Sequence, residues 1–149
     1  MDPLPPDPHA YASRYAVGTA AEASRTITEA DVLLFADLTG DHNPFHVDEA
    51  FASRTRLGGR IAHGLLTAGL LSGVLGMQLP GPGAVYVSQT LQFLQPVRIG
   101  DTITVRVEVV ELVVERKRIR AATTWRNQHG QAVLEGEAWL TLPRPQLTA

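Results

Sequence analysis

The chain has 149 residues, a length that is usual for one domain, and 44% of its residues are hydrophobic and 19% charged. The formal net charge is -2 and cysteine is absent, which excludes a disulfide framework, a thiolate metal site and a cysteine nucleophile. Because no basic excess is present and no apolar run follows a basic N-terminus, we expect a cytoplasmic protein without a signal peptide, a nucleic-acid partner or a membrane partner.

The two ends of the chain differ from its middle in composition. Residues 1–14 hold four of the ten prolines and few large apolar side chains, and the last residues have a similar character. Segments of this kind are often poorly ordered. We therefore expect residues 1–14 to be an extended lead-in, residues 15–142 to form a single domain and residues 143–149 to be a flexible tail.

The domain is predicted to begin with a strand and a capped helix. The strand is expected within Ala21–Ile27. Thr28 and Asp31 then have the spacing of a capping box, with Asp in place of the usual Glu. Apolar residues follow at helical intervals as far as Gly40, which is expected to end this helix.

A polar segment, Asp41–Asp48, follows this helix. Pro44 disfavours helical geometry at Asn43, so the segment is expected to be a shaped loop. A short helix is predicted for Asp48–Ser53.

A long apolar segment in the middle of the chain predicts a helix from about Ala62 to Leu79, ended by Pro80–Gly83. The segment is almost long enough to span a membrane, but its polar and glycine residues favour a buried central helix. Gly69, Gly73 and Gly76 recur at helical spacing within it. They indicate either close packing of the helix on a sheet or a ligand groove.

From residue 85 onward the hydrophobic pattern has a period of two, which is typical of strands, and short links predict antiparallel neighbours. The residues expected to share a face in four successive strands are Val85, Val87, Gln89, Leu91 and Phe93; Ile103, Val105, Val107 and Val109; Ile119, Ala121, Thr123 and Trp125; and Leu134, Ala138, Leu140 and Leu142. The order of the elements predicts an α+β fold, in which a curved antiparallel β-sheet wraps around the long apolar helix.

The polar segment carries an acid and an imidazole close together in sequence. Asp41 and His46, with Asn43 between them, are the residue types that proton transfer at neutral pH requires. The same residue types are frequent in ordinary turns and helix caps. Their spacing alone therefore leaves a purely structural loop as the alternative.

A metal site is a further alternative, because His42 and His46 lie four residues apart and His63 follows later. Two histidines at this spacing converge on a metal when they share a helix, and Pro44 lies between these two. Since no cysteine or other metal-binding pattern accompanies them, we expect no metal.

The start of the long helix is a second candidate for chemistry. The first amide groups of a helix lack internal partners and carry partial positive charge, so the amide of Gly64 suits a substrate carbonyl oxygen. His63 is expected to cap or pack there, and Ser72 to bond back to the Ala68 carbonyl. The basic cluster at residues 116–118 is expected to be a solvated hairpin end, with contact to substrate phosphates as the alternative.

Two sequence segments together resemble the signature of the MaoC-like hydratases. Residues 35–48 read FADLTGDHNPFHVD and residues 61–66 read IAHGLL. The sequence is similar to the short, single-domain (R)-specific enoyl-CoA hydratases over about residues 20–142. The resemblance implies a hot-dog fold, in agreement with a sheet around a helix. It also implies addition of water to the 2,3 double bond of a trans-2-enoyl-CoA, giving (3R)-3-hydroxyacyl-CoA without a metal or redox cofactor.

The resemblance implies roles for individual residues. Asp41 and His46 match the catalytic pair that positions and deprotonates water and protonates C2. Asn43 and Ser72 match supporting residues, and Gly64 matches the backbone amide that holds the thioester oxygen.

The candidates for the acyl pocket are Leu65, Thr67 and Gly69, of which the last two are mild departures from the family pattern. The expected partners are an acyl-CoA thioester and further copies of the chain, in a homodimer or higher homo-oligomer, because an isolated subunit leaves a sheet edge and one flank of its helix exposed. A dehydratase acting on carrier-protein substrates and a non-catalytic acyl-thioester-binding module are the alternatives. The intact pair of Asp41 and His46 argues against the non-catalytic module.

Overall fold

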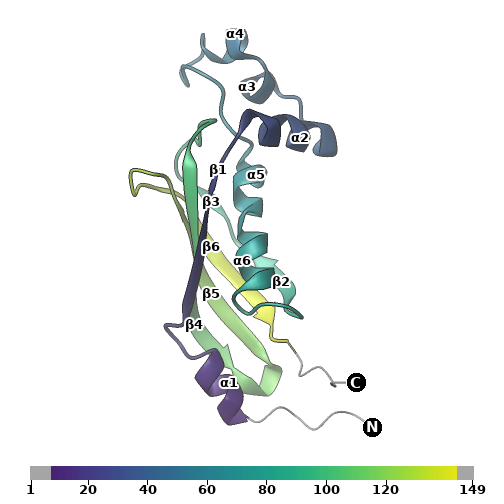
Figure 1. Cartoon of the computed structure of the whole chain (residues 1–149), viewed down its shortest axis with the longest axis vertical. Helices are drawn as coiled ribbons and strands as arrows, with labels where there is room; N and C mark the ends of the chain where they lie inside the picture. The colour runs from purple at the N-terminus through teal and green to yellow at the C-terminus, as the bar shows by residue number, and fades with distance from the viewer. Residues whose placement is uncertain (1–7, 144–149) are drawn as a thin grey trace.

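The computed structural model describes residues 8–143 and has a curved antiparallel sheet with helices on its concave side and at both ends (Figure 1). The strands are β1 (Ala20–Thr26), β2 (Val85–Gln89), β3 (Gln92–Phe93), β4 (Thr102–Val113), β5 (Arg118–Arg126) and β6 (Ala132–Thr141). The helices are α1 (Pro8–Arg14), α2 (Glu29–Thr39), α3 (Pro44–Val47), α4 (Glu49–Ala52), α5 (Gly64–Gly69), α6 (Leu71–Met77) and the 3-10 helix η1 (Val114–Arg116).

The sheet has the strand order β1-β4-β5-β6-β2, and β3 pairs with β6 beside this path. The period-two pattern of β4, β5 and β6 is confirmed, since the residues predicted to share a face in these three strands are buried. They form one core with α6, to which Leu71, Val74 and Leu75 contribute from the helix. Figure 1 shows α5 and α6 running along the sheet, with α2, α3 and α4 gathered at one end of it. The α+β hot-dog architecture is thereby confirmed.

The capped helix is also confirmed. The Thr28 hydroxyl oxygen accepts from the Asp31 amide at 3.1 Å, and the Asp31 carboxylate accepts from the Thr28 amide at 3.0 Å. Gly40 ends α2 in the left-handed region, with φ 78°, and donates to the Ala36 carbonyl. This cap sets the point from which the following polar segment leaves the helix.

The central helix differs from its prediction in extent. It begins at Gly64 and is divided into α5 and α6 at Leu70, whose amide donates to the Thr67 carbonyl three residues earlier. The expectation that an isolated subunit leaves one flank of this helix exposed is confirmed. Leu65 is 63% and Met77 74% exposed, so one face of the helix remains open.

The three helix glycines lie on this open face. A Cβ atom built on Gly69, Gly73 or Gly76 would meet nothing within 4 Å. Close packing on the sheet of the same chain is therefore not the reason for these glycines. Among the described residues they are instead accessible to a ligand or to another polypeptide.

The predicted strand over residues 85–93 is interrupted. It divides into β2 and β3, and the pairing of β2 with β6 shifts register between Tyr86 and Ser88. The shift ends the simple alternation, so Val85, Val87 and Phe93 are exposed instead of sharing a core face. At the interruption the Thr90 carbonyl approaches the backbone of Gly136 so closely that a Cβ there would overlap its oxygen.

The N-terminal prediction is wrong for residues 8–14, which form α1 instead of an extended lead-in. Tyr11 and Tyr15 are buried in the main core, so their apolar rings hold this segment against the end of the sheet. Residues 1–7 of the lead-in and residues 144–149 of the tail lie outside the described residues. Within residues 8–143, no helix has the length and apolar character that crossing a membrane requires.

Candidate active site

The segment that carries Asp41 and His46 is more ordered than the predicted loop. Residues 44–47 form one helical turn, because Pro44 occupies its first position, where the missing amide is not needed. The Asn43 side-chain oxygen caps this turn by accepting from the Phe45 amide at 3.1 Å. The Asn43 backbone amide donates to Oδ1 of Asp41, also at 3.1 Å. Asn43 therefore links the orientation of the Asp41 side chain to the helical turn that carries His46.

His46 is held from both its ring and its backbone. Nδ1 lies 2.8 Å from the carbonyl oxygen of Ile61. Since a carbonyl can only accept, Nδ1 carries the proton, and Nε2 of a neutral His46 keeps its lone pair. Nε of Arg60 donates to the His46 carbonyl at 2.6 Å. The arrangement leaves Nε2 as the basic atom of this imidazole.

Residue 63 brings the two parts of the site together. Its Nε2 atom lies 2.9 Å from the Asp41 carbonyl oxygen, and its ring stacks on His46 with centroids 3.9 Å apart and planes 29° apart. His63 is only 2% exposed, and burial is the main cause that lowers its pKa below 6.5. It makes no side-chain cap at the start of α5, so packing is its role there.

Gly64 is the first residue of α5, so its backbone amide lies at the helix start, as the sequence predicted. The ring of Phe93 lies directly against its backbone. A Cβ atom built on Gly64 would be 2.6 Å from Cε1 of Phe93. Glycine at this position lets an aromatic ring, and equally a flat thioester group, approach the start of the helix.

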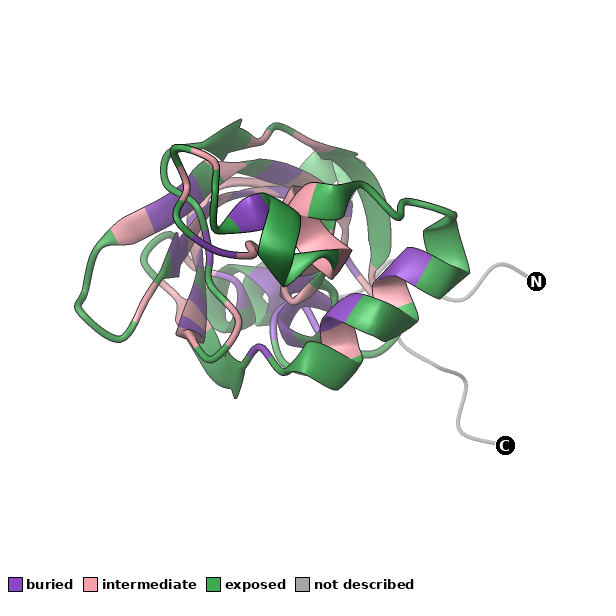
Figure 2. Cartoon of the chain, turned by 90° about the horizontal axis from the view of Figure 1, so that it is seen from above, coloured by how far each residue is buried: buried purple, intermediate pink, exposed green. Residues whose placement is uncertain are grey.

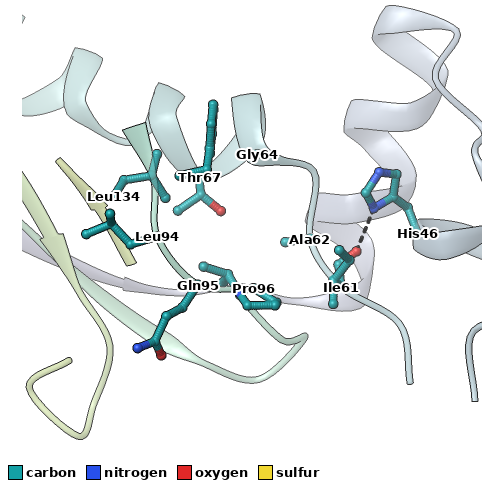
Figure 3. Close-up of a pocket in the computed structure, with 11 residues that line it drawn as sticks. His46, Ile61, Ala62, Gly64, Thr67, Leu94, Gln95, Pro96 and Leu134 are labelled. Atoms are coloured by element: carbon teal, nitrogen blue, oxygen red, sulfur yellow. Dashed lines mark hydrogen bonds between the residues drawn. The ribbon is translucent and has the colours of Figure 1, made fainter. Parts of the chain in front are cut away.

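Asp41, His46, His63 and Gly64 share one cavity of about 530 Å³, which Phe35, Thr39, Leu65 and Phe93 complete. A second cavity of about 310 Å³ adjoins it and is lined by His46, Gly64 and Phe93 on the shared side (Figure 3). Thr67 lines this second cavity, and its hydroxyl oxygen faces the space while having no hydrogen-bond partner. His46 and Gly64 thus border both cavities, whereas Asp41 borders only the larger one.

Leu65 and Gly69 lie together in a third hollow of about 420 Å³, on the open face of the helix beside Tyr86 and Val87. Ser72 lines the same hollow and makes no hydrogen bond with Asp41 or His46 within the described part of the chain. It also makes no bond to the Ala68 carbonyl there. Its supporting role remains a prediction.

The potential ligand atoms of Asp41, His46 and His63 all lie within 4.8 Å of one another. A metal needs lone pairs that converge on one point. The lone pairs of imidazoles lie in the ring planes, and the two rings are stacked instead of facing a common centre. Nδ1 of His46 and Nε2 of His63 are also engaged with backbone carbonyls. The cluster therefore fits proton transfer better than metal binding.

The basic residues 116–118 lie at the β4–β5 connection, near α1 and at the opposite end of the sheet from α2–α4 (Figure 1). Their placement favours the solvated hairpin end over contact with substrate phosphates.

The helices α2–α4, seen from their own end of the sheet, have a largely exposed outer surface (Figure 2).

Two neighbours of the site were not predicted as parts of it. Arg60 and Phe93 come from segments whose patterns indicated only a turn and a strand. Gly64 was a signal for Phe93 alone, since a glycine at a helix start indicates that something approaches closely.

The comparisons with known proteins agree with this geometry. A family model described as MaoC like domain matches residues 14–131. A 3-hydroxybutyryl-CoA dehydratase of Methylorubrum extorquens is 54% identical over 130 residues, which are 87% of this chain and 82% of that protein. An (R)-specific enoyl-CoA hydratase of Rhodospirillum rubrum is 51% identical over 126 residues, 85% of this chain and 87% of that protein.

The fold comparison leads to the same family. The solved structure of an (R)-hydratase from A. caviae involved in PHA biosynthesis has a TM-score of 0.83 and 42% identity, and the match covers 85% of this chain and 96% of that one. With the sheet wrapped around its helix and with the family model matched over most of its length, the chain belongs to the MaoC-like family.

Proposed function

We propose that the chain is an (R)-specific enoyl-CoA hydratase, a hydro-lyase that adds water to trans-2-enoyl-CoA and forms (3R)-3-hydroxyacyl-CoA. One observation carries the proposal: Asp41, His46 and the start of α5 border a single cavity. The names of the M. extorquens and R. rubrum relatives support CoA thioesters as the substrate class.

The proposed mechanism divides the reaction between these groups. Asp41 and His46 hold a water molecule and remove its proton as the water oxygen bonds to C3. The negative charge that develops on the thioester oxygen is stabilised by the amide of Gly64, at the positive end of α5. A proton then passes from the pair to C2, so that the product has gained one water and no electrons. The reverse order of these steps dehydrates the same thioester.

The experiment is hydration of crotonyl-CoA by the purified protein, with chiral analysis of the product and a crotonyl carrier-protein substrate in parallel. We expect rapid hydration of the CoA thioester and a (3R) alcohol. A predominantly (3S) product would contradict the assignment even if hydration were fast. Preference for the carrier-bound substrate would favour the dehydratase alternative, and no turnover with bound thioester would favour the binding module.

We further propose that two copies associate through the open face of the helix and strand β2. Three observations support a second copy as the partner: β2 lies at a sheet edge, Leu65 and Met77 are exposed, and the helix glycines meet nothing. Sheet edges and apolar faces of this kind favour association. Light scattering at micromolar concentration should give at least the mass of a dimer, and a fully active monomer would contradict the proposal.

The acyl chain is proposed to run past Gly64 along hollows lined by the three predicted residues. Leu65 and Gly69 border the hollow on the open helix face, and Thr67 borders the inner cavity. The two hollows would lead the acyl chain in different directions. Because Gly69 lines only the hollow on the open helix face, the acyl chain-length profile of Gly69 variants shows which hollow the acyl chain occupies.

A further inference from the structure

His63 is a buried titratable side chain in the catalytic cavity to which the mechanism above gives no task. It contacts both members of the catalytic pair. Its Nε2 atom is 2.9 Å from the Asp41 carbonyl oxygen, and its ring face lies on the His46 ring at 3.9 Å. Phe35 packs on His63 with ring centroids 4.8 Å apart.

The hydrogen bond determines which nitrogen carries the proton. Because the Asp41 carbonyl can only accept, Nε2 of His63 is the donor and Nδ1 of the neutral ring has no proton. Nδ1 is buried and has no hydrogen-bond partner within residues 8–143. A side chain that only filled space here would need no ring nitrogens, and the neighbouring Phe35 has none.

We propose that His63 is a positioning residue for the hydration reaction. It sets the spacing of Asp41 and His46 by holding the backbone of Asp41 and the ring of His46. The proposal rests on the proposed function, since it assigns Asp41 and His46 as the acid–base pair. His63 contacts no reacting atom in this scheme and acts through its two neighbours.

The charge state of His63 matters for this task. When His46 takes the proton from water, its imidazolium lies against the face of a neutral aromatic ring, which is attractive. A protonated His63 would instead place two positive charges about 4 Å apart, which is repulsive. The charged or titratable groups around it are Asp41, His46 and His42, and burial is the largest cause that keeps its pKa low, with His42 the smallest.

The test separates the two contacts with two variants. His63→Gln keeps an amide that can donate to the Asp41 carbonyl but loses the stacked ring, whereas His63→Phe keeps a ring and loses the donor. We expect each to lower kcat for crotonyl-CoA hydration by 10- to 100-fold while KM changes less than threefold. His42→Gln is the matched control, since His42 is exposed and pairs with Asp37 outside the cavity, and its kcat should stay within twofold of the wild type.

A combined variant distinguishes positioning from loss of folded protein. In the Asp41→Asn background, His63→Phe should lower kcat less than threefold further, because its effect passes through Asp41. An equal loss in both backgrounds, or wild-type kcat in both single variants, would overturn the proposal. Absence of hydration by the wild-type protein would instead refute the proposed function.

One measurement needs no variant and so does not depend on folding of an altered chain. The ring nitrogens of His63 in the wild-type protein should report a neutral Nε2–H tautomer by nitrogen-15 NMR between pH 7 and pH 8. A protonated ring or the Nδ1–H tautomer in this range would overturn the assigned arrangement.

Discussion

The ring of Phe93 lies against the backbone of Gly64 so closely that a Cβ atom on residue 64 would come within 2.6 Å of Cε1. The contact joins a two-residue strand to the first residue of α5. Phe93 is 53% exposed, and it lines both of the cavities that His46 also lines.

Gly64→Ala tests this contact. The new methyl group must displace the Phe93 ring and crowds the amide proposed to hold the thioester oxygen. Because complete loss of one oxyanion donor lowers kcat by about 10²–10³, we expect a smaller loss, on the order of tenfold. Steady-state kinetics with crotonyl-CoA measure it. Adding Phe93→Leu to Gly64→Ala should restore part of the activity, and no recovery would locate the damage at the amide alone.

Asp41→Asn and His46→Gln test the acid–base pair. Each variant keeps approximate shape but loses proton exchange, so kcat should fall by about 10²–10⁴. The double variant should lose much less than the product of the single losses, since the pair acts on one water. Thermal stability and acyl-CoA binding should change little. Wild-type turnover in either single variant would contradict the assignment, and loss of folding would favour a structural role for the segment.

The buried state of His63 predicts a pH dependence of stability. Its pKa in the folded protein lies below 6.5, chiefly because burial disfavours the charged ring. Below about pH 6.5 the unfolded chain therefore binds a proton that the folded chain does not, and stability decreases as the pH falls. Chemical denaturation between pH 5 and pH 8 should show this slope in the wild type and a shallower slope in His63→Phe.

His42 provides a control of opposite sign for that measurement. The Asp37 carboxylate raises the pKa of His42, so its contribution is present below pH 6.5 and is lost as the pH rises through the folded-state pKa. The pair is exposed and screened by solvent, so the effect of His42→Gln should be small. An identical effect of the two substitutions would contradict the assignment of the acid-side slope to His63.

Gly136→Ala should destabilise the protein severely. Its Cβ would overlap the Thr90 carbonyl oxygen and lie 2.7 Å from the carbonyl carbon, and neither backbone atom can move without breaking the pairing of β6. Overpacking typically costs about 1–3 kcal/mol, and this backbone overlap should lie at or above the upper end of that range, measurable as a lower denaturation midpoint. Glu135→Ala, at the exposed neighbouring position, should change stability by less than about 0.5 kcal/mol. Equal effects of the two would show that β6 tolerates a side chain at Gly136.

Gly69→Leu should shift the preference of the enzyme toward short enoyl chains while leaving crotonyl-CoA turnover largely intact. The side chain would project into the hollow beside Leu65, where a Cβ on residue 69 has no described residue within 4 Å. Rates along a series from crotonyl-CoA to dodecenoyl-CoA measure the profile. An unchanged profile would remove Gly69 from the acyl pocket, and a loss of the dimer would assign the position to the interface between copies.

The sequence by itself determined those features that depend on near neighbours in the chain. The cap at Thr28 and Asp31 and the buried faces of β4 and β5 follow from spacing, because a helix start and a strand face each repeat over a few residues. The proximity of Asp41 and His46 was likewise readable, since Asn43 and Pro44 order the turn between them.

Only the tertiary structure decided which distant groups complete the site. His63 meets His46, and Phe93 meets Gly64, because folding of the sheet around the helix brings separate segments into one cavity. No local pattern encodes such contacts. The residues on the open face of α5 and α6 have the same origin, because the sheet of one chain reaches around only part of the helix, and Leu65 remains exposed.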